Sequence, residues 1–310
     1  MIVVGGEALV DLVPAPGTVD EEISPLYPRL GGGPYNVAIA LGRLGIPVAF
    51  YARLSTDDFG DKLLQRLLDS NVDTSLVERG EQPTTLAVVA LQEDGSARYS
   101  FHVEGSAARF VSERELPEGT SAVSLGTLGM VLEPGATVYE KVLFEQASRG
   151  KFVALDPNVR PDLIEDPAAY RERFRSWLPS VDLLKLSVED AEWLAAGGDV
   201  LRAVREWQRS GPAAVVLTRG SEGLAVLAGD ADAVEVPTVR VDVADTIGAG
   251  DTVQAALLAW LHRNGALSPD AVRGLSGEQW ASALRFAASA AAVTVSRPGA
   301  EPPWAGELDW

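Results

Sequence analysis

The 310-residue chain has no cysteine and only two histidines, His102 and His262. The absence of cysteine excludes disulfides, thiol catalysis and thiolate metal sites, and so few imidazoles argue against a His-rich metal centre. There is also no run of about 18 apolar residues of the kind that spans a membrane. Residues 1–7 resemble a buried strand rather than a signal peptide, because a basic n-region is missing. We therefore expect a soluble, cytoplasmic protein.

Basic residues are few: 26 Lys and Arg stand against 44 Asp and Glu, which gives a formal net charge of −18. A surface of this sign repels nucleic acid and acidic membranes, so we expect neither as a partner. Two common nucleotide-binding signatures are missing as well. The chain has no Gly-x-x-x-x-Gly-Lys-Ser/Thr sequence, which excludes a P-loop. It has no Gly-x-Gly-x-x-Gly after its first strand, which argues against a dinucleotide-binding protein.

Short apolar runs and helical patterns alternate along most of the chain. The runs lie at 48–51, 122–125, 152–155, 183–186 and 214–217. Residues 62–68 are typical of the helical patterns between them. This alternation predicts an α/β fold with a mainly parallel central sheet and helices on both faces. Ligands of such folds gather at the carboxyl ends of the strands.

Two strand-like segments break the alternation. Residues 84–90 and 97–103 are separated by the sequence Glu-Asp-Gly-Ser, which is typical of a hairpin turn, and no helix lies between them. They predict a small sheet outside the main layer. The alternative is an antiparallel edge on the main sheet.

The glycine-rich stretch 245–252, Asp-Thr-Ile-Gly-Ala-Gly-Asp-Thr, precedes an apolar helical pattern. Its small residues let backbone N–H groups point at one spot, and the positive end of a helix that begins near Asp251 adds to the attraction for an anion such as phosphate. Asp251 would then be a fixed carboxylate beside the anion, placed to take a proton from an attacking hydroxyl. The alternative is that Asp251 only caps the helix.

Polar segments follow four of the predicted strands, at 7–11, 156–160, 185–190 and 218–223. Asp11 is interpreted as the end of an apolar strand. A further segment, Gly-Gly-Gly-Pro-Tyr-Asn at 31–36, precedes a helical pattern that stops at Gly45. Because the carboxyl ends of parallel strands meet at one edge of a sheet, the four segments predict a single active site.

Two of these motifs carry a resemblance to a known family. The Gly-Gly-x-x-x-Asn sequence that ends at Asn36 and the Asp-Thr-x-Gly-Ala-Gly-Asp sequence that begins at Asp245 are similar to the two signatures of the ribokinase-like (PfkB) carbohydrate kinases. The resemblance covers nearly the whole chain. It implies one ribokinase-like domain over residues 1–310, with a small β-sheet lid from about 12–30 and 84–105.

Three further segments look most like those of bacterial fructokinases: Asp-Pro-Asn-x-Arg-Pro from Asp156, Thr-Arg-Gly-Ser-Glu-Gly from Thr218, and the tail Ser-Arg-Pro-Gly-Ala. The resemblance therefore implies ATP-dependent phosphorylation of a sugar, with the 6-hydroxyl of D-fructose as the expected acceptor. 2-Keto-3-deoxygluconate kinase and other sugar kinases of the family are alternatives. A catalytically silent sugar-binding regulatory protein is an alternative of another class.

The resemblance also implies roles for individual residues. Asp251 is the base, and Arg160 binds phosphate oxygens or the sugar with its planar fork. The anion hole falls on Gly248, Ala249, Gly250 and Asp251. Sugar binding falls on Asp11, Gly32, Gly33, Asn36, Arg98, Phe101, Asn158 and Asp251. Nucleotide contacts fall on Lys185, Ser187, Thr218, Gly220, Gly223, Gly248 and Gly250.

Metal ions and partners complete what the resemblance implies. We expect Mg²⁺ to bind mainly through ATP phosphates and water. Asp190 would organise that water, although Ser187 stands where many members of the family carry Asn. Asp245 matches a ligand of a monovalent-cation site, which makes K⁺ a candidate; the alternative is that Asp245 caps the turn. An exposed edge of the lid would allow two subunits to pair as a homodimer.

Overall fold

A computed structural model describes residues 1–15, 25–91 and 97–310, without the side chains of residues 91, 97 and 98. Within these ranges the main sheet has nine strands, in the order β13-β12-β11-β10-β9-β8-β1-β4-β5. In chain order they are β1 (Ile2–Gly5), β4 (Val48–Ser55), β5 (Val77–Gly80), β8 (Ala122–Gly126), β9 (Phe152–Asp156), β10 (Leu183–Ser187), β11 (Ala214–Thr218), β12 (Leu224–Ala228) and β13 (Val234–Val236).

The main sheet is parallel from β5 to β11, and β12 and β13 extend it in antiparallel fashion. All five apolar runs identified in the sequence are strands of this sheet, so the predicted α/β class with a mainly parallel sheet is confirmed. The sequence did not predict β5, β12 and β13. Strands of four and three residues, such as β5 and β13, are too short to show a periodicity.

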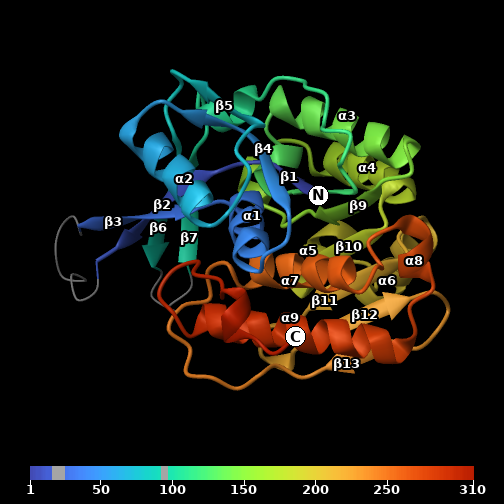
Figure 1. Cartoon of the computed structure of the whole chain (residues 1–310). Helices are drawn as coiled ribbons and strands as arrows, with labels where there is room; N and C mark the ends of the chain where they lie inside the picture. The colour runs from blue at the N-terminus through green and yellow to red at the C-terminus, as the bar shows by residue number, and fades with distance from the viewer. Residues whose placement is uncertain (16–24, 92–96) are drawn as a thin grey trace.

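Helices cover both faces of the main sheet (Figure 1). The side chains of β1 alternate between the two cores: Ile2 and Val4 lie in one and Val3 in the other. The first core is closed by α1 (Gly33–Arg43), α2 (Asp58–Asp69), α7 (Ala249–Arg263), α8 (Pro269–Arg273) and α9 (Gly277–Val295). The second is closed by α3 (Gly135–Ser148), α4 (Pro167–Trp177), α5 (Val188–Ala195) and α6 (Val200–Arg209).

Short 3₁₀ helices complete the connections. They are η1 (Ala107–Phe110), η2 (Thr127–Met130), η3 (Pro161–Leu163), η4 (Leu178–Ser180), η5 (Gly220–Glu222) and η6 (Ala305–Glu307). In the described ranges, none of the helices is both long enough and apolar enough to cross a lipid bilayer.

A second sheet of four strands, again counted over the described ranges, lies to one side of the main sheet (Figure 1). Its order is β3 (Leu26–Gly31), β2 (Leu9–Pro14), β6 (Thr85–Leu91) and β7 (Ala97–His102). The strands β6 and β7 pair in antiparallel fashion, as predicted, and the alternative that they form an edge of the main sheet is wrong. The predicted turn between them, at 93–96, lies outside the described residues.

The predicted position of Asp11 at the end of an apolar strand is wrong. Asp11 lies inside β2 of the second sheet, opposite Arg29 of β3 and Ala87 of β6. The apolar stretch 2–14 is two strands rather than one, because the chain turns at Gly6, whose φ of 148° few other residues adopt. The continuous hydrophobicity of that stretch hides the turn.

Candidate active site

A cavity of about 260 Å³ lies where the carboxyl edge of the main sheet meets the second sheet. It is lined by Glu7, Leu9, Asp11, Gly32, Gly33, Asn36, Tyr99, Phe101, Thr127, Leu128, Asn158, Arg160, Lys185, Thr246, Ile247, Gly248, Gly250 and Asp251. Carboxylates and cations both line it, and the predicted segments at 7–11, 156–160 and 185–190 each contribute. Three of the four segments predicted to converge therefore meet at one cavity, whereas the fourth, 218–223, does not line it.

The glycine-rich turn forms one wall of the cavity. Gly248 is the N-cap of α7, with φ 78°, and the helix begins at Ala249 rather than near Asp251. A Cβ at Gly248 would lie 2.6 Å from the Cβ of Ala300, and a Cβ at Gly250 would lie 2.9 Å from Nζ of Lys185. Both positions therefore need glycine because the chain and a side chain approach closely.

The N–H groups of this turn do not all face a ligand. The N–H of Ala249 donates to the carbonyl of Thr246 at 3.3 Å, so it is used within the turn. Gly250 and Asp251 lie in the first turn of α7, where N–H groups have no partner inside the helix. Among the four N–H groups predicted for the anion hole, only that of Ala249 donates a hydrogen bond in the described residues, so those of Gly248, Gly250 and Asp251, at the positive end of a 15-residue helix, remain available to an anion.

Asp251 is buried, with 8% of its surface exposed, and it lines the cavity. Its Oδ2 accepts a hydrogen bond of 2.9 Å from Nδ2 of Asn36, and its side chain does not cap α7. The alternative that Asp251 is only a helix cap is therefore wrong. Burial raises the pKa of Asp251, while the Asn36 amide, Lys185 and Arg160 act to lower it. A raised pKa makes the carboxylate a stronger base.

Lys185, which was predicted as a nucleotide contact, lines the cavity. Its Nζ is 2.7 Å from Oδ2 of Asp156, and both side chains are buried. Burial by itself would lower the pKa of Lys185, but the carboxylates of Asp156, Asp251 and Asp190 raise it. For Asp156, burial acts in the opposite direction: it raises the pKa to about 6, and the positive charge of Lys185 opposes this rise. At neutral pH the pair is ionised, and it places a fixed positive charge beside Gly250.

Arg160 and Asn158 follow β9 and form a polar chain into the cavity. Nη1 of Arg160 donates to Oδ1 of Asn158 at 2.7 Å, and Nδ2 of Asn158 donates to Oγ1 of Thr127 at 3.3 Å. All the hydrogen bonds of Arg160 to other described residues involve Nη1. The remaining N–H groups of the guanidinium are therefore available to an anion or to a sugar oxygen.

The opposite wall comes from the second sheet and the start of α1. Burial raises the pKa of Asp11 to about 6, an effect that Arg160 opposes. Gly32 has φ 112°, and a Cβ there would lie 2.7 Å from the carbonyl oxygen of Glu7. Phe101 lines the cavity and stacks on Tyr99, with ring centroids 5.8 Å apart. The backbone of Arg98 lies in β7, but its side chain is outside the described part of the structure.

The remaining predicted nucleotide residues lie outside the cavity, at the same edge of the sheet. Thr218 ends β11 directly opposite Ser187 of β10. Gly220 and Gly223 follow in the turn after β11, with φ 53° and 94°. These residues therefore lie at the ends of β10 and β11, beside the strand that carries Lys185.

Both carboxylate oxygens of Asp190 accept hydrogen bonds from neighbouring residues. Its Oδ1 accepts from the N–H of Val159 at 2.7 Å, and its Oδ2 accepts from the N–H and the hydroxyl of Ser187. The carboxylate thus ties the loop after β9 to the capping box of α5. No group of three or more His, Cys, Asp or Glu side chains in the described ranges is arranged to hold a metal ion.

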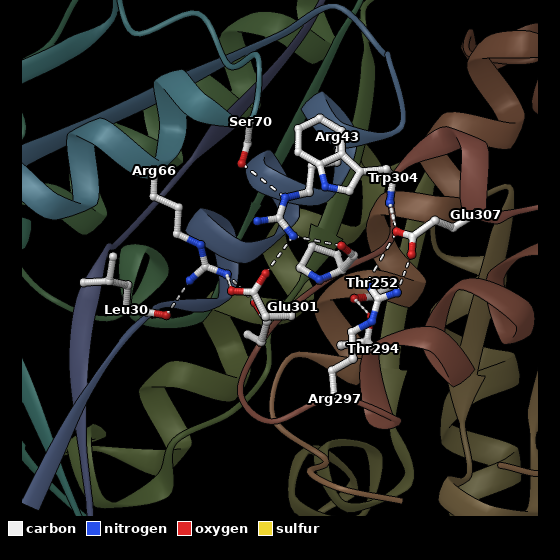
Figure 2. Close-up of polar contacts among 12 residues, drawn as sticks. Leu30, Arg43, Arg66, Ser70, Thr252, Thr294, Arg297, Glu301, Trp304 and Glu307 are labelled. Atoms are coloured by element: carbon white, nitrogen blue, oxygen red, sulfur yellow. Dashed lines mark hydrogen bonds and ion pairs between the residues drawn. The ribbon is translucent and has the colours of Figure 1, made fainter. Parts of the chain in front are cut away.

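The C-terminal tail closes the anion-hole turn. Asp245 accepts hydrogen bonds from the N–H groups of Ile247 and Gly299, so it does cap the turn, the alternative to its cation role. The next residue, Ala300, covers Gly248. Thr252 and Thr294 add a hydroxyl contact of 2.9 Å between α7 and α9, which is drawn in Figure 2.

Two arginines hold the tail in this position, as Figure 2 shows. Arg66 of α2 donates to the carbonyls of Leu30 and Ala300 and to Oε1 of Glu301. Arg43 of α1 donates to Oε2 of Glu301 at 2.8 Å. Glu301 is therefore bound by arginines of two helices. Arg66 also contacts Leu30 in β3, just before the glycines 31–33.

Several polar residues of the site were not assigned roles from the sequence, among them Glu7, Tyr99 and Thr127 in the cavity lining and Asp156, which pairs with Lys185. Glu7 is buried and accepts from the N–H groups of Gly33 and Gly129, each at 3.1 Å. Its position inside an apolar run was a usable signal, because a carboxylate there must find donors. Thr127 gave no signal, since nothing in its local sequence distinguishes it.

Comparisons with known proteins agree with this site. Residues 1–305 match the pfkB family of carbohydrate kinases. A fructokinase of Rhizobium leguminosarum bv. trifolii is 37% identical over 278 residues, which are 89% of this chain and 84% of that protein.

Solved structures extend the likeness. The crystal structure of a Xylella fastidiosa fructokinase with bound ATP is similar with a TM-score of 0.87 at 28% identity, covering 99% of this chain and 94% of that one. A Vibrio cholerae O395 fructokinase in fructose, ADP and calcium ion bound form gives a TM-score of 0.80 at 25% identity, covering 96% and 94%. The predicted ribokinase-like fold is confirmed. Since the family match spans almost the entire sequence and the signature residues meet in one cavity, the chain belongs to the pfkB family of carbohydrate kinases.

Proposed function

We propose that this protein is an ATP-dependent fructokinase that transfers the γ-phosphate of ATP to the 6-hydroxyl of D-fructose and releases fructose 6-phosphate and ADP. One observation carries the proposal: the buried carboxylate of Asp251 lies between an anion hole on α7 and a polar cavity under the second sheet. We infer fructose as the sugar from the relatives, since the similar protein from Rhizobium leguminosarum bv. trifolii is a fructokinase.

In the proposed reaction Asp251 takes the proton of the 6-hydroxyl as that oxygen attacks the γ-phosphorus. The bond from the γ-phosphorus to the β,γ-bridging oxygen breaks, and ADP leaves with the electron pair. Charge on the transferring phosphoryl group is stabilised by the N–H groups of Gly250 and Asp251 and by the side chains of Lys185 and Arg160. Sugar hydroxyls pair with Asp11 and Asn36, and Gly32 and Gly33 allow close approach of the ring.

ATP would bind along the strand ends and turns that carry Ser187, Thr218, Gly220 and Gly223, with its γ-phosphate at Gly248 and Gly250. Mg²⁺ bound with ATP would supply positive charge to the phosphate oxygens. Both oxygens of Asp190 already accept hydrogen bonds, so the described residues fit an ion held by phosphates and water, with Asp190 shaping the loop around it. Each oxygen of Asp245 keeps one lone pair, which leaves K⁺ as a proposal that a potassium titration of kcat tests.

A sugar panel tests the proposed function. Purified protein is given ATP with fructose, 2-keto-3-deoxygluconate, ribose or a nucleoside, and the phosphorylated carbon is located by ³¹P and ¹³C NMR. We expect the highest kcat/KM with fructose and phosphate on carbon 6. Strong activity with 2-keto-3-deoxygluconate and none with fructose would assign the other kinase. Calorimetric sugar binding without any phosphorylated product would indicate a silent regulatory protein.

Three further features belong to the proposal. The second sheet would act as a lid on a single domain of residues 1–310, because two of its strands line the cavity with Asp11, Tyr99 and Phe101. Two subunits would pair through the exposed edge of that sheet. We place the protein in the cytoplasm, where ATP and free sugar meet, and cell fractionation tests that location.

A further inference from the structure

The floor of the cavity holds a residue in an unusual conformation. Thr127 begins η2 directly after β8, is buried, and has φ 50°, a region that a β-branched residue very rarely adopts. Asn158, its hydrogen-bond partner across the cavity floor, also has a positive φ, of 39°. Strained residues of this kind cluster at functional sites, where the surrounding structure holds them for a purpose.

The position of the Thr127 hydroxyl points to that purpose. A point one bond length from the Cα of Gly33, where a Cβ would stand, is 2.5 Å from Oγ1 of Thr127, 3.3 Å from Nδ2 of Asn158 and 3.4 Å from Oδ1 of Asp251. Three polar atoms, from η2, from the loop after β9 and from α7, thus converge beside Gly33. One of them belongs to the base of the proposed reaction.

The hydrogen bonds around Thr127 determine whether its hydroxyl can donate to a ligand. Oγ1 accepts from Asn158, whose Oδ1 in turn accepts from the Arg160 guanidinium at 2.7 Å. Across the described ranges, the Thr127 hydroxyl hydrogen has no recorded acceptor. A hydroxyl that accepts from a chain of this kind is polarised toward donating, and Thr127 faces the cavity.

We propose that Thr127 is a sugar-binding and specificity-determining residue, whose hydroxyl donates a hydrogen bond to one non-reacting hydroxyl of the sugar and so orients the acceptor hydroxyl toward Asp251. Arg160 and Asn158 act on the sugar through Thr127. The left-handed backbone at residue 127 turns the side chain into the cavity instead of along the sheet. This inference rests on the proposed sugar kinase function and adds the residue that reads the sugar.

Two variants of Thr127 remove the hydroxyl in different ways. Thr127→Val keeps the shape and the β-branching, whereas Thr127→Gly removes the backbone strain together with the side chain. We expect fructose affinity, measured by calorimetry, to fall about 3- to 10-fold in both, the effect of one neutral hydrogen bond. Thr127→Ser should restore most of the affinity lost in Thr127→Val. The KM for ATP should stay within about twofold of the wild type in all three.

A panel of monodeoxyfructoses separates recognition from a structural role. For one analogue, the one that lacks the partner hydroxyl, the wild type and Thr127→Val should bind equally well. Thr137→Val, on the exposed face of α3, is the matched control and should bind all sugars like the wild type. If Thr127→Val weakens every analogue by the same factor, or weakens none, the assignment of Thr127 is overturned.

Two other outcomes are interpreted separately: a Thr127→Val protein that does not fold, and a wild type that does not use fructose. If Thr127→Val does not fold, Thr127→Gly decides, because its backbone is unstrained at this φ, and wild-type affinity in the glycine variant overturns the proposal. If the wild type neither binds nor phosphorylates fructose, the proposed function fails first. The same panel is then built on whichever sugar the protein does phosphorylate.

Discussion

Asp251 combines three properties that a general base needs: burial, a partner that fixes its orientation, and a raised pKa. Asn36 holds Oδ2, which leaves Oδ1 on the side of Gly33 and the cavity. Burial raises the pKa of this carboxyl, and the Asn36 amide and the positive charges of Lys185 and Arg160 oppose that rise. These properties fit the proposed role of Asp251 as the base, and its side chain does not cap the helix.

We expect Asp251→Asn to lower kcat by about 10² to 10⁴-fold, since the amide keeps the shape but cannot take a proton. Binding of ATP and fructose should stay within roughly tenfold, because the backbone N–H groups of the anion hole remain. Steady-state kinetics and calorimetry measure the two effects. Asp242→Asn, an exposed carboxylate outside the cavity, is the control. Wild-type turnover in a folded Asp251→Asn protein would rule out the proposed base.

Glu7 gives a prediction about stability. Burial raises its pKa from 4.5 to about 8, against the effect of the N–H groups that it accepts from. The folded protein therefore binds this proton more tightly than the unfolded chain, so the contribution is complete below about pH 4.5 and is lost as pH rises toward 8. Between pH 6 and pH 8 the loss is about 2 kcal/mol.

Denaturant unfolding at pH 6 and pH 8 measures this loss. The free energy of unfolding should fall more in the wild type than in Glu7→Gln, whose side chain stays neutral throughout. Glu104→Gln, at a side chain that is 88% exposed, should keep the wild-type pH dependence. Equal pH dependence in the wild type and Glu7→Gln would show that Glu7 is not protonated in the folded protein.

At the scale of elements, the anion hole depends on segments far from α7 in the sequence. The tail that covers Gly248 is held by Arg66 of α2 and Arg43 of α1 through Glu301 (Figure 2). Arg66 also contacts the carbonyl of Leu30 in β3, at 3.1 Å. The second sheet, two helices and the tail are thus joined at one side chain.

We expect Arg66→Met to lower kcat about tenfold with a smaller change in fructose KM, because the tail no longer holds the anion-hole turn in place. Kinetics and a thermal melt should be run together. Arg202→Met removes an exposed arginine of α6 with an equally long side chain and serves as the control. A wild-type kcat in Arg66→Met would show that the turn keeps its geometry without the tail contacts.

The second sheet yields the next prediction. Closure of a lid on the sugar would exclude water from the phosphoryl group and complete the site. Saturating fructose should slow hydrogen exchange in β6 and β7, while β9, inside the main sheet, should change little. Unchanged exchange in both strands would mean that the second sheet is a fixed wall of the cavity.

For the whole molecule, the edge of the second sheet is the surface on which we expect a homodimer. Tyr27 of β3 is 55% exposed and Leu26 is 40% exposed, on a strand whose other edge pairs with β2. Unpaired edges with exposed apolar side chains favour pairing with a second chain.

Sedimentation velocity tests this surface. The wild type should sediment as a dimer, and Leu26→Lys with Tyr27→Lys as a monomer, because buried charges would oppose the pairing. Leu201→Lys, at a leucine of α6 that is 68% exposed, makes the same kind of change outside the second sheet and should remain a dimer. A monomeric wild type, or a dimeric double variant, would contradict pairing through β3.

The sequence by itself determined the fold class and the main chemistry. Strands buried on both faces are continuous apolar runs, and the anion-hole turn is one local motif, so both could be identified from short stretches. Asp251, Gly248, Gly250 and Arg160 were predicted in the site and all four line the cavity. Local chemistry is sufficient where one segment contains the whole feature.

Tertiary structure alone decided how these segments work together. The sequence put Asp11 at the end of an apolar strand and the N–H of Ala249 in the anion hole, because a turn inside an apolar stretch and a hydrogen bond inside a loop leave no pattern. Lys185 proved to be central since β10 and β9 place it against Asp156. Thr127 became visible only through its φ and its neighbours from three elements. Distances between segments far apart in the chain are set by packing, which no local pattern records.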